Sequence, residues 1–126
     1  MEIRGIYLKA TRIRITNNST YKLRALQSKT GLTPNILLRI GFGLSLRDTS
    51  SIDPAKYPED GMEINRYTLT GEYDIAFVAL LNIWLANNNI QINDTNLNGY
   101  FRAHINRGAI LMSNKLKSLT DLAFLE

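Results

Sequence analysis

Residues 11–35 read TRIRITNNSTYKLRALQSKTGLTPN, and this stretch carries the clearest structural signals in the chain. Residues 11–16 alternate strictly between polar and apolar side chains, which is typical of a half-buried β-strand. Such a strand places Arg12 and Arg14 together on one face and two isoleucines on the other. The arginine face has two interpretations: it contacts nucleic acid, or it protects a sheet edge by its charge.

Two helices follow this strand and are separated by a tight turn. The first begins at one of several N-caps in residues 17–20 and runs to about Lys29, where Gly31 is suited to end it. A threonine–proline pair then opens a second helix over residues 35–46. Strand, helix, turn and helix is the order of a ribbon-helix-helix module, in which two chains pair their strands and insert them into the major groove of DNA.

Small residues in the second helix predict that another backbone comes close to it. Gly41 and Ser45 are four residues apart and therefore lie on one face of the helix. We expect the backbone of a neighbouring helix to approach this face, and the alternative is a DNA backbone.

Positive charge is concentrated at the start of the chain. Residues 1–47 contain nine Lys and Arg against one acid, a balance of +8, whereas residues 48–101 carry −6 and residues 102–126 carry +2. A basic segment of this size favours a nucleic-acid binder. The alternative is a basic face that only keeps the protein soluble.

The chain predicts a mainly α fold with one short N-terminal strand, in a single domain over residues 1–126 that assembles as a homo-oligomer. Residues 1–46 form the basic strand–helix–helix module. Residues 47–62 combine acids and prolines with little periodicity, which predicts a long mobile surface loop. Residues 63–126 form the helical part that brings copies together.

The strongest helix opens at Thr70 or Gly71, and from Ile75 to Ala86 its only polar residue is Asn82. A helix that is apolar nearly all round needs cover on every side, and this one is too short to span a bilayer. We expect a second copy to supply that cover, and the alternative is a central helix within a monomer. The expected interface residues are Phe77, Leu81 and Trp84.

A further helix is expected from Thr95 to a stop at Gly108. After it, another helical stretch leads into a tail over residues 120–125. Residues 102–107 give the end of the first of these helices a polar, basic character around His104. This end either contacts a phosphate or is simply a solvated face.

Several kinds of chemistry are excluded by composition. The chain has no cysteine and a single histidine, so thiolate nucleophiles, iron–sulfur ligation and multi-histidine metal centres are ruled out. It has no phosphate-binding glycine loop and no convincing carboxylate metal site. No secretory signal pattern is present, which favours a cytoplasmic location. We therefore expect a protein without cofactor, metal or enzymatic activity.

Three blocks of the sequence resemble the signatures of the DndE family, the small component of the Dnd DNA phosphorothioation system. The first block comprises Leu26, residues 30–35, Arg39, Gly41 and residues 44–46; the second covers residues 65–72 and continues into residues 80–81; the third covers residues 101–108. The resemblance implies a helical bacterial protein that forms tetramers and binds DNA, with a preference for nicked duplex. It also implies partners: a cysteine desulfurase, an iron–sulfur component and an ATPase-like component.

Without cysteine, the chain cannot carry the sulfur that such a system transfers. The expected role is a non-enzymatic DNA-binding or scaffold subunit that grips backbone phosphates of intact or nicked duplex. The alternatives are a ribbon-helix-helix repressor that reads a short palindrome and a protein-only adaptor. A DNA nickase has no support beyond His104.

The expected phosphate contacts are Arg12, Arg14, Lys22, Lys29, Thr33, Asn35, Arg39, Arg66, Arg102 and Arg107. Thr33 and Asn35 would act through the free N–H groups at a helix N-terminus. Arg39 and Arg66 have an equally supported alternative role, which is to bridge subunits or to cap backbone carbonyls.

Overall fold

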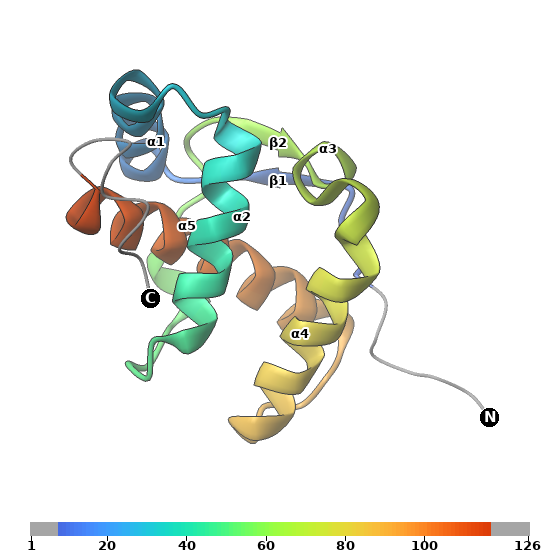
Figure 1. Ribbon diagram of the computed structural model, residues 1–126. Helices are drawn as coiled ribbons and strands as arrows, with labels where there is room; N and C mark the ends of the chain where they lie inside the picture. Colours follow the sequence, from blue (N-terminus) through green and yellow to red (C-terminus); the bar gives the residue numbers. More distant parts are fainter. Residues whose placement is uncertain (1–7, 117–126) are drawn as a thin grey trace.

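The computed structural model describes residues 8–116 and is mainly helical (Figure 1). A two-stranded sheet lies behind one end of α2, and α1 and α4 lie on opposite sides of the molecule. In chain order the elements are β1 (Arg12–Arg14), α1 (Asn17–Thr30), α2 (Pro34–Arg47), the 3-10 turn η1 (Pro54–Lys56), β2 (Glu63–Asn65), α3 (Arg66–Thr70), the 3-10 turn η2 (Gly71–Tyr73), α4 (Asp74–Asn87) and α5 (Asp94–Lys115).

The fold is centred on the crossing of α2 and α5 (Figure 1). The backbones of the two helices are in contact at Gly41 and Gly108. A Cβ atom added at Gly41 would lie only 2.8 Å from the carbonyl carbon of Gly108, which leaves no room for a side chain. This contact confirms that a neighbouring helix is the backbone that approaches Gly41. The expected helix stop at Gly108 is wrong: α5 continues through it to Lys115, and the glycine is a packing residue.

The helix boundaries in the N-terminal half are set by local caps, of which Thr33 and Gly31 were predicted. The N-cap of α1 is Thr16, one residue before the expected range 17–20; its side chain accepts a hydrogen bond from the backbone of Ser19, and Thr33 opens α2 in the same way. Gly31 ends α1 in the left-handed conformation, with φ of 73°, which glycine adopts at low cost. These local signals were sufficient because each acts within a few residues of the helix end.

The sheet is formed within one chain. β1 pairs antiparallel with β2, so that Ile13 lies opposite Ile64 and both are buried, while Arg12 and Arg14 face outward. The outward arginines and inward isoleucine confirm the strand periodicity. The second strand was not predicted, and it takes the place that a second copy would hold in a ribbon-helix-helix dimer.

The core is filled from both halves of the sequence. The ring of Phe42 on α2 packs against Phe101 of α5 and Phe77 of α4, with centroids 5.5 and 5.1 Å apart. The helix expected to open at Thr70 or Gly71 is preceded by α3 and η2 and begins at Asp74. Residues 47–62 contain η1 and pack against α5. The expected tail at residues 120–125 lies outside the described residues.

Candidate nucleic-acid interface

The third block, residues 101–108, serves as an internal clamp. Arg107 is buried, and its guanidinium donates to the hydroxyl and carbonyl oxygens of Ser45 at 2.8 and 2.6 Å. It also donates to the carbonyl oxygen of Ser50 at 2.8 Å. This arginine was expected to contact phosphate. Instead it ties α5 to the end of α2 and to the segment that follows α2.

His104 is fully buried beside this arginine, so the ring has no access to solvent. The Ser45 hydroxyl, which accepts a hydrogen bond from Arg107, is also hydrogen-bonded to His104 Nδ1, 2.8 Å away. The other ring nitrogen, Nε2, is buried without a hydrogen-bond partner among residues 8–116, and the imidazole packs edge-on against the ring of Trp84, with centroids 4.4 Å apart. Burial, with a smaller contribution from the charge of Arg107, lowers the pKa of His104 to about 3. A neutral, enclosed histidine is a structural residue.

Arg102 holds the 47–62 segment against α5. Its guanidinium donates to the carbonyl oxygens of Tyr57 and Pro54, and its Nε lies 3.5 Å from a carboxylate oxygen of Glu59. In the same block, Asn106 is buried and accepts a hydrogen bond from the backbone of Thr16 at 2.9 Å. The segment predicted to be mobile is thus anchored at several carbonyl groups.

Arg66 is also buried and internal. It forms an ion pair with Asp74 at 3.1 Å and donates to the carbonyl oxygens of Leu8 and Ala10. Arg39 donates to the carbonyl oxygens of Leu69 and Thr68 at the end of α3. Both arginines therefore take the carbonyl-capping role that was the alternative to a phosphate contact.

α1 carries the expected contacts that remain available to a ligand. Lys22 is half-buried and Lys29 is exposed, as is Arg24, which was not among the predicted contacts. α1 and α2 contain no acidic residue, and no side chain of α1 forms an ion pair with another residue in the range 8–116. This helix presents uncompensated positive charge together with the exposed ring of Tyr21.

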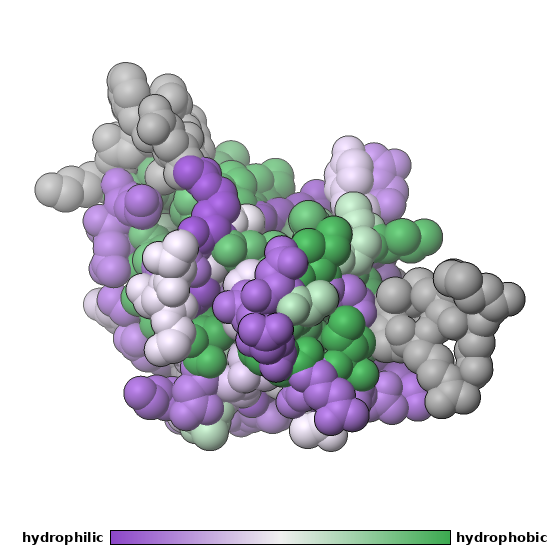
Figure 2. All heavy atoms as spheres, turned by 90° about the horizontal axis from the view of Figure 1, so that it is seen from below, coloured by the Kyte–Doolittle hydropathy of each residue, from purple (hydrophilic) through white to green (hydrophobic). Residues whose placement is uncertain are grey.

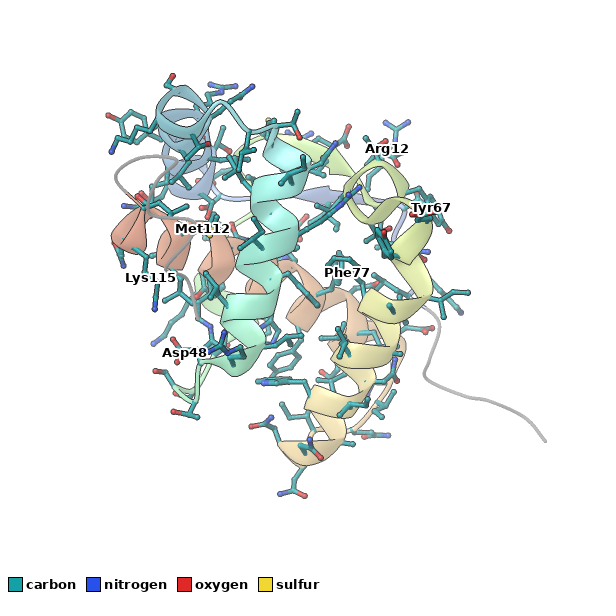
Figure 3. All side chains as sticks on the ribbon, in the orientation of Figure 1. Arg12, Asp48, Tyr67, Phe77, Met112 and Lys115 are labelled. Carbon is teal, nitrogen blue, oxygen red and sulfur yellow. The ribbon has the colours of Figure 1, made fainter. Side chains whose placement is uncertain are left out.

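The strand arginines are exposed but partly compensated. Arg12 extends away from the body of the protein in Figure 3 and lies 3.4 Å from Glu63. Arg14 lies 3.9 Å from the same carboxylate and donates to the carbonyl oxygen of Gly61 at 2.9 Å. Together with Arg102, these two arginines line one open groove. The structure therefore brings together three of the expected contacts that are far apart in the sequence.

Two expected contacts lie at the start of α2. Thr33 is exposed and Asn35 is half-buried, and the Thr33 hydroxyl accepts a hydrogen bond from the backbone of Ile36 at 3.5 Å. The helix N-terminus is thus capped by its own threonine. α1 ends at Thr30 and α2 begins at Pro34, so Thr33 and Asn35 come soon after Lys29 in the chain.

The outer face of α4 is apolar and uncovered. Phe77, Leu81 and Trp84, the expected interface residues, lie on the inner face: Phe77 points toward α2 (Figure 3), Leu81 is fully buried, and Trp84 packs on Tyr100. The opposite face exposes 85% of Ile75, 49% of Leu80 and 56% of Ile83. Figure 2 shows hydrophobic side chains reaching the surface in this part of the molecule.

α4 alone has 14 residues, but the stretch Arg66–Asn87, which joins α3, η2 and α4, is long and apolar enough to cross a membrane by length and composition alone. In the structure, a third of its most apolar window is buried inside the subunit. Its first residue, Arg66, forms a buried ion pair with Asp74 within the same stretch. One face of this stretch is therefore packed inside the subunit, and its ion pair is internal. These features fit a core helix whose outer face is exposed.

No cluster of three or more metal-ligating side chains occurs within residues 8–116. The expected contacts that remain accessible lie on α1, at the start of α2 and in the arginine groove. The family model described as DNA sulphur modification protein DndE matches residues 12–120 of the sequence. The chain belongs to the DndE family. This confirms the resemblance of the three blocks and places the protein in the DNA phosphorothioation system.

Two solved structures share the fold. The crystal structure of DndE from Escherichia coli B7A, involved in DNA phosphorothioation modification, is 24% identical, with a TM-score of 0.69 over 84% of this chain and 98% of that one. A DndE G21/24K mutant involved in DNA phosphorothioation is 22% identical, with a TM-score of 0.65 over 84% of this chain and 99% of the other. No curated protein sequence matches the chain.

Within the DndE family fold, the blocks that identify the family are mostly structural. Arg39 joins α2 to α3, and Arg107, His104 and the Gly41–Gly108 contact join α2 to α5. Arg102 of the third block also lines the open groove. Sequence reasoning missed Arg24 and the outer face of α4. The absence of acids around Arg24 and the spacing of Ile75, Ala79 and Ile83 were the signals that could have identified them.

Proposed function

We propose that the protein is a non-enzymatic DNA-binding and scaffold subunit of the phosphorothioation machinery, acting in the cytoplasm. The observation that supports this most strongly is the surface of α1 in a member of the DndE family: Lys22, Arg24 and Lys29 form no ion pair with another residue of the range 8–116. Cations placed in this way bind phosphates by releasing counterions from DNA. Thr33 and Asn35 extend this surface to the start of α2.

The test is fluorescence anisotropy with a labelled duplex, intact or nicked, at several salt concentrations. If three side chains of α1 neutralise three phosphates, affinity falls roughly 40-fold between about 50 and 200 mM salt. The double variant Lys22→Ala and Lys29→Ala should weaken binding. It should also make the slope of log affinity against log salt shallower, by the contribution of nearly two phosphates. The matched control, Lys56→Ala with Lys115→Ala, removes two exposed lysines that lie outside α1 and should bind normally.

Binding that does not depend on salt, or that falls equally in both double variants, would overturn the role of α1. Absence of any complex near physiological salt would favour the adaptor role, in which the basic surface docks an acidic protein. A short palindrome bound far more tightly than other duplexes would favour the repressor.

The non-enzymatic role rests on chemistry. The chain has no thiol to carry sulfur, and its single histidine is enclosed and bonded to Ser45. Incubation of supercoiled plasmid with the protein and Mg²⁺ should leave the plasmid intact. Appearance of nicked product that copurifies with the protein would contradict the proposal.

The scaffold role includes self-association through the outer face of α4. Exposed Ile75, Ala79 and Ile83 follow one another at four-residue spacing, and exposed Leu80 lies beside them, three residues before Ile83. Apolar patches of this kind mark contact surfaces. A second copy would present the same patch, so the two faces can cover each other. Dimers paired in this way assemble further into the tetramer that we expect. They leave the basic surface of α1 free for DNA and other surfaces free to dock the iron–sulfur and ATPase-like subunits.

Light scattering tests this assembly. Leu80→Glu combined with Ile83→Glu should reduce the mass of the particle to half or less, because two charges cannot be buried at the contact without partners. Ile36→Glu provides a control, since Ile36 is 40% exposed on α2, away from the patch. An unchanged mass in the α4 variant would refute the assigned surface.

A further inference from the structure

An open groove of about 410 Å³ lies between β1 and the N-terminal half of α5. Arg12 and Arg14 line it from the strand, Thr95, Asn98 and Arg102 line it from α5, and Glu59 lines it from the segment after η1. None of these residues belongs to α1. The groove is therefore a second positively charged feature, separate from the surface proposed to bind duplex DNA.

Two of the three guanidinium groups in the groove are held in position. Arg102 is anchored by the carbonyl oxygens of Tyr57 and Pro54, and only 16% of its side chain is exposed. Arg14 donates to the carbonyl oxygen of Gly61. Groups fixed before a ligand arrives lose little conformational freedom on binding, which favours affinity.

The groove contains more positive than negative charge. Glu59 is the one carboxylate among its lining residues; it is 63% exposed and contacts Arg102 at 3.5 Å. Glu63, outside the lining, is shared between Arg12 and Arg14 at 3.4 and 3.9 Å. These contacts are long and exposed, so an incoming oxyanion can replace them at small cost.

The shape and donors of the groove limit the ligand. A volume of about 410 Å³ falls in the range of small-molecule sites, roughly 300–1,000 Å³, and a double helix is too wide to enter. Guanidinium groups match phosphate oxygens in geometry and charge. Asn98 uses its carbonyl oxygen to accept from the backbone of Ala10, so its amide nitrogen is the group available to donate to a ligand.

We propose that this groove binds a phosphate monoester, carried by a free nucleotide or by the end of a nucleic-acid strand. The phosphate lies among Arg12, Arg14 and Arg102, and it carries about −1.5 to −2 charges near neutral pH. Glu59 is an internal competitor for Arg102, and the incoming phosphate displaces it.

Calorimetric titration of the full chain with inorganic pyrophosphate tests the site. Arg12→Gln should weaken binding about fivefold, because Arg12 is 70% exposed and its side chain can be shortened without disturbing the core. Lys115→Gln removes an equal charge at the far end of α5, outside the groove and outside α1, and should leave binding unchanged. Glu59→Gln should tighten binding about two- to fivefold by removing the competitor. Thermal melting of each variant verifies that it is folded.

Two further titrations identify the source of the phosphate. One compares dAMP with deoxyadenosine, and the other compares a 5′-phosphorylated oligonucleotide with the same strand lacking that phosphate. Binding that requires the phosphate in either pair supports the site and identifies its ligand. Absence of pyrophosphate binding, or equal losses in Arg12→Gln and Lys115→Gln, overturns it.

The outcome is independent of the proposed function. Duplex DNA without terminal phosphates can bind through α1 while pyrophosphate does not bind, and then only the groove is refuted. Conversely, pyrophosphate can bind normally in the Lys22→Ala and Lys29→Ala variant that no longer binds duplex.

Discussion

Replacing Gly108 by alanine adds one methyl group at the crossing of α2 and α5. The new Cβ atom would lie 2.4 Å from the carbonyl carbon of Gly41 and 2.5 Å from its carbonyl oxygen. Both atoms belong to the backbone of a helix, so no side-chain rotation can relieve the contact. The helices must separate by about 1 Å to restore an ordinary van der Waals distance.

The cost follows from two opposed effects. Forcing an additional methyl group into a close-packed site costs about 1–3 kcal/mol, and rigid backbone on both sides places this case at the upper end. Alanine also favours the helix over glycine by about 1 kcal/mol. The free energy of unfolding should therefore fall by about 2 kcal/mol, which lowers Tm by roughly 8 °C in a chain of this length.

Gly43 provides the matched control, since it lies in α2 and a Cβ atom added there meets no other atom within 4 Å. Gly43→Ala should raise the free energy of unfolding by about 1 kcal/mol, the propensity gain alone. Urea unfolding followed by circular dichroism measures both variants. The packing argument fails if Gly108→Ala is as stable as the parent, or if both substitutions change stability in the same direction.

Three further predictions concern the interior. The pKa of His104 is lowered from 6.5 to about 3. Between these two pH values the histidine takes up a proton in the unfolded chain and stays neutral in the folded one. The free energy of unfolding therefore falls by up to about 1.4 kcal/mol for each pH unit below 6.5. Urea unfolding at pH 7 and pH 5 should show this loss in the parent and a smaller one in His104→Asn. Asp74→Asn leaves Arg66 buried without its anion and should cost about 3 kcal/mol in the same assay; a loss below about 1 kcal/mol would contradict a buried pair. Gly71 has φ of 57° and lies against the Arg39 guanidinium, so Gly71→Ala should cost about 1–3 kcal/mol and lower Tm in a thermal scan, whereas an unchanged Tm would refute the strain.

The elements that the sequence predicted correctly are those defined by neighbours in the chain. Thr33 caps α2 and Gly31 ends α1 through contacts that span a few residues. The continuation of α5 through Gly108 could not be predicted, because the glycine is required by a backbone 67 positions away in the chain. A glycine that ends a helix and one that receives a neighbouring helix look the same in sequence.

The arginines illustrate the same limit for the candidate site. Composition indicates that a guanidinium requires oxygen partners, and phosphate and backbone carbonyl both meet that requirement. Arg66 finds Leu8 and Ala10, and Arg107 finds Ser45 and Ser50, at separations of about 56 to 62 residues. Only the tertiary structure decides which arginines are hydrogen-bonded to carbonyl and hydroxyl groups of the protein itself. The cations of α1, which have no such partners among residues 8–116, form the surface that we propose for DNA.

The start of α1 is completed by residues from much later in the chain. The carbonyl oxygen of Ile15 accepts from the backbone of Gly61, and the backbone of Thr16 donates to Asn106, 90 residues downstream. During synthesis on the ribosome, the basic N-terminal segment therefore emerges long before its last partner. The nascent chain must remain incompletely folded until α5 has left the exit tunnel, with its cations exposed to the ribosomal RNA nearby.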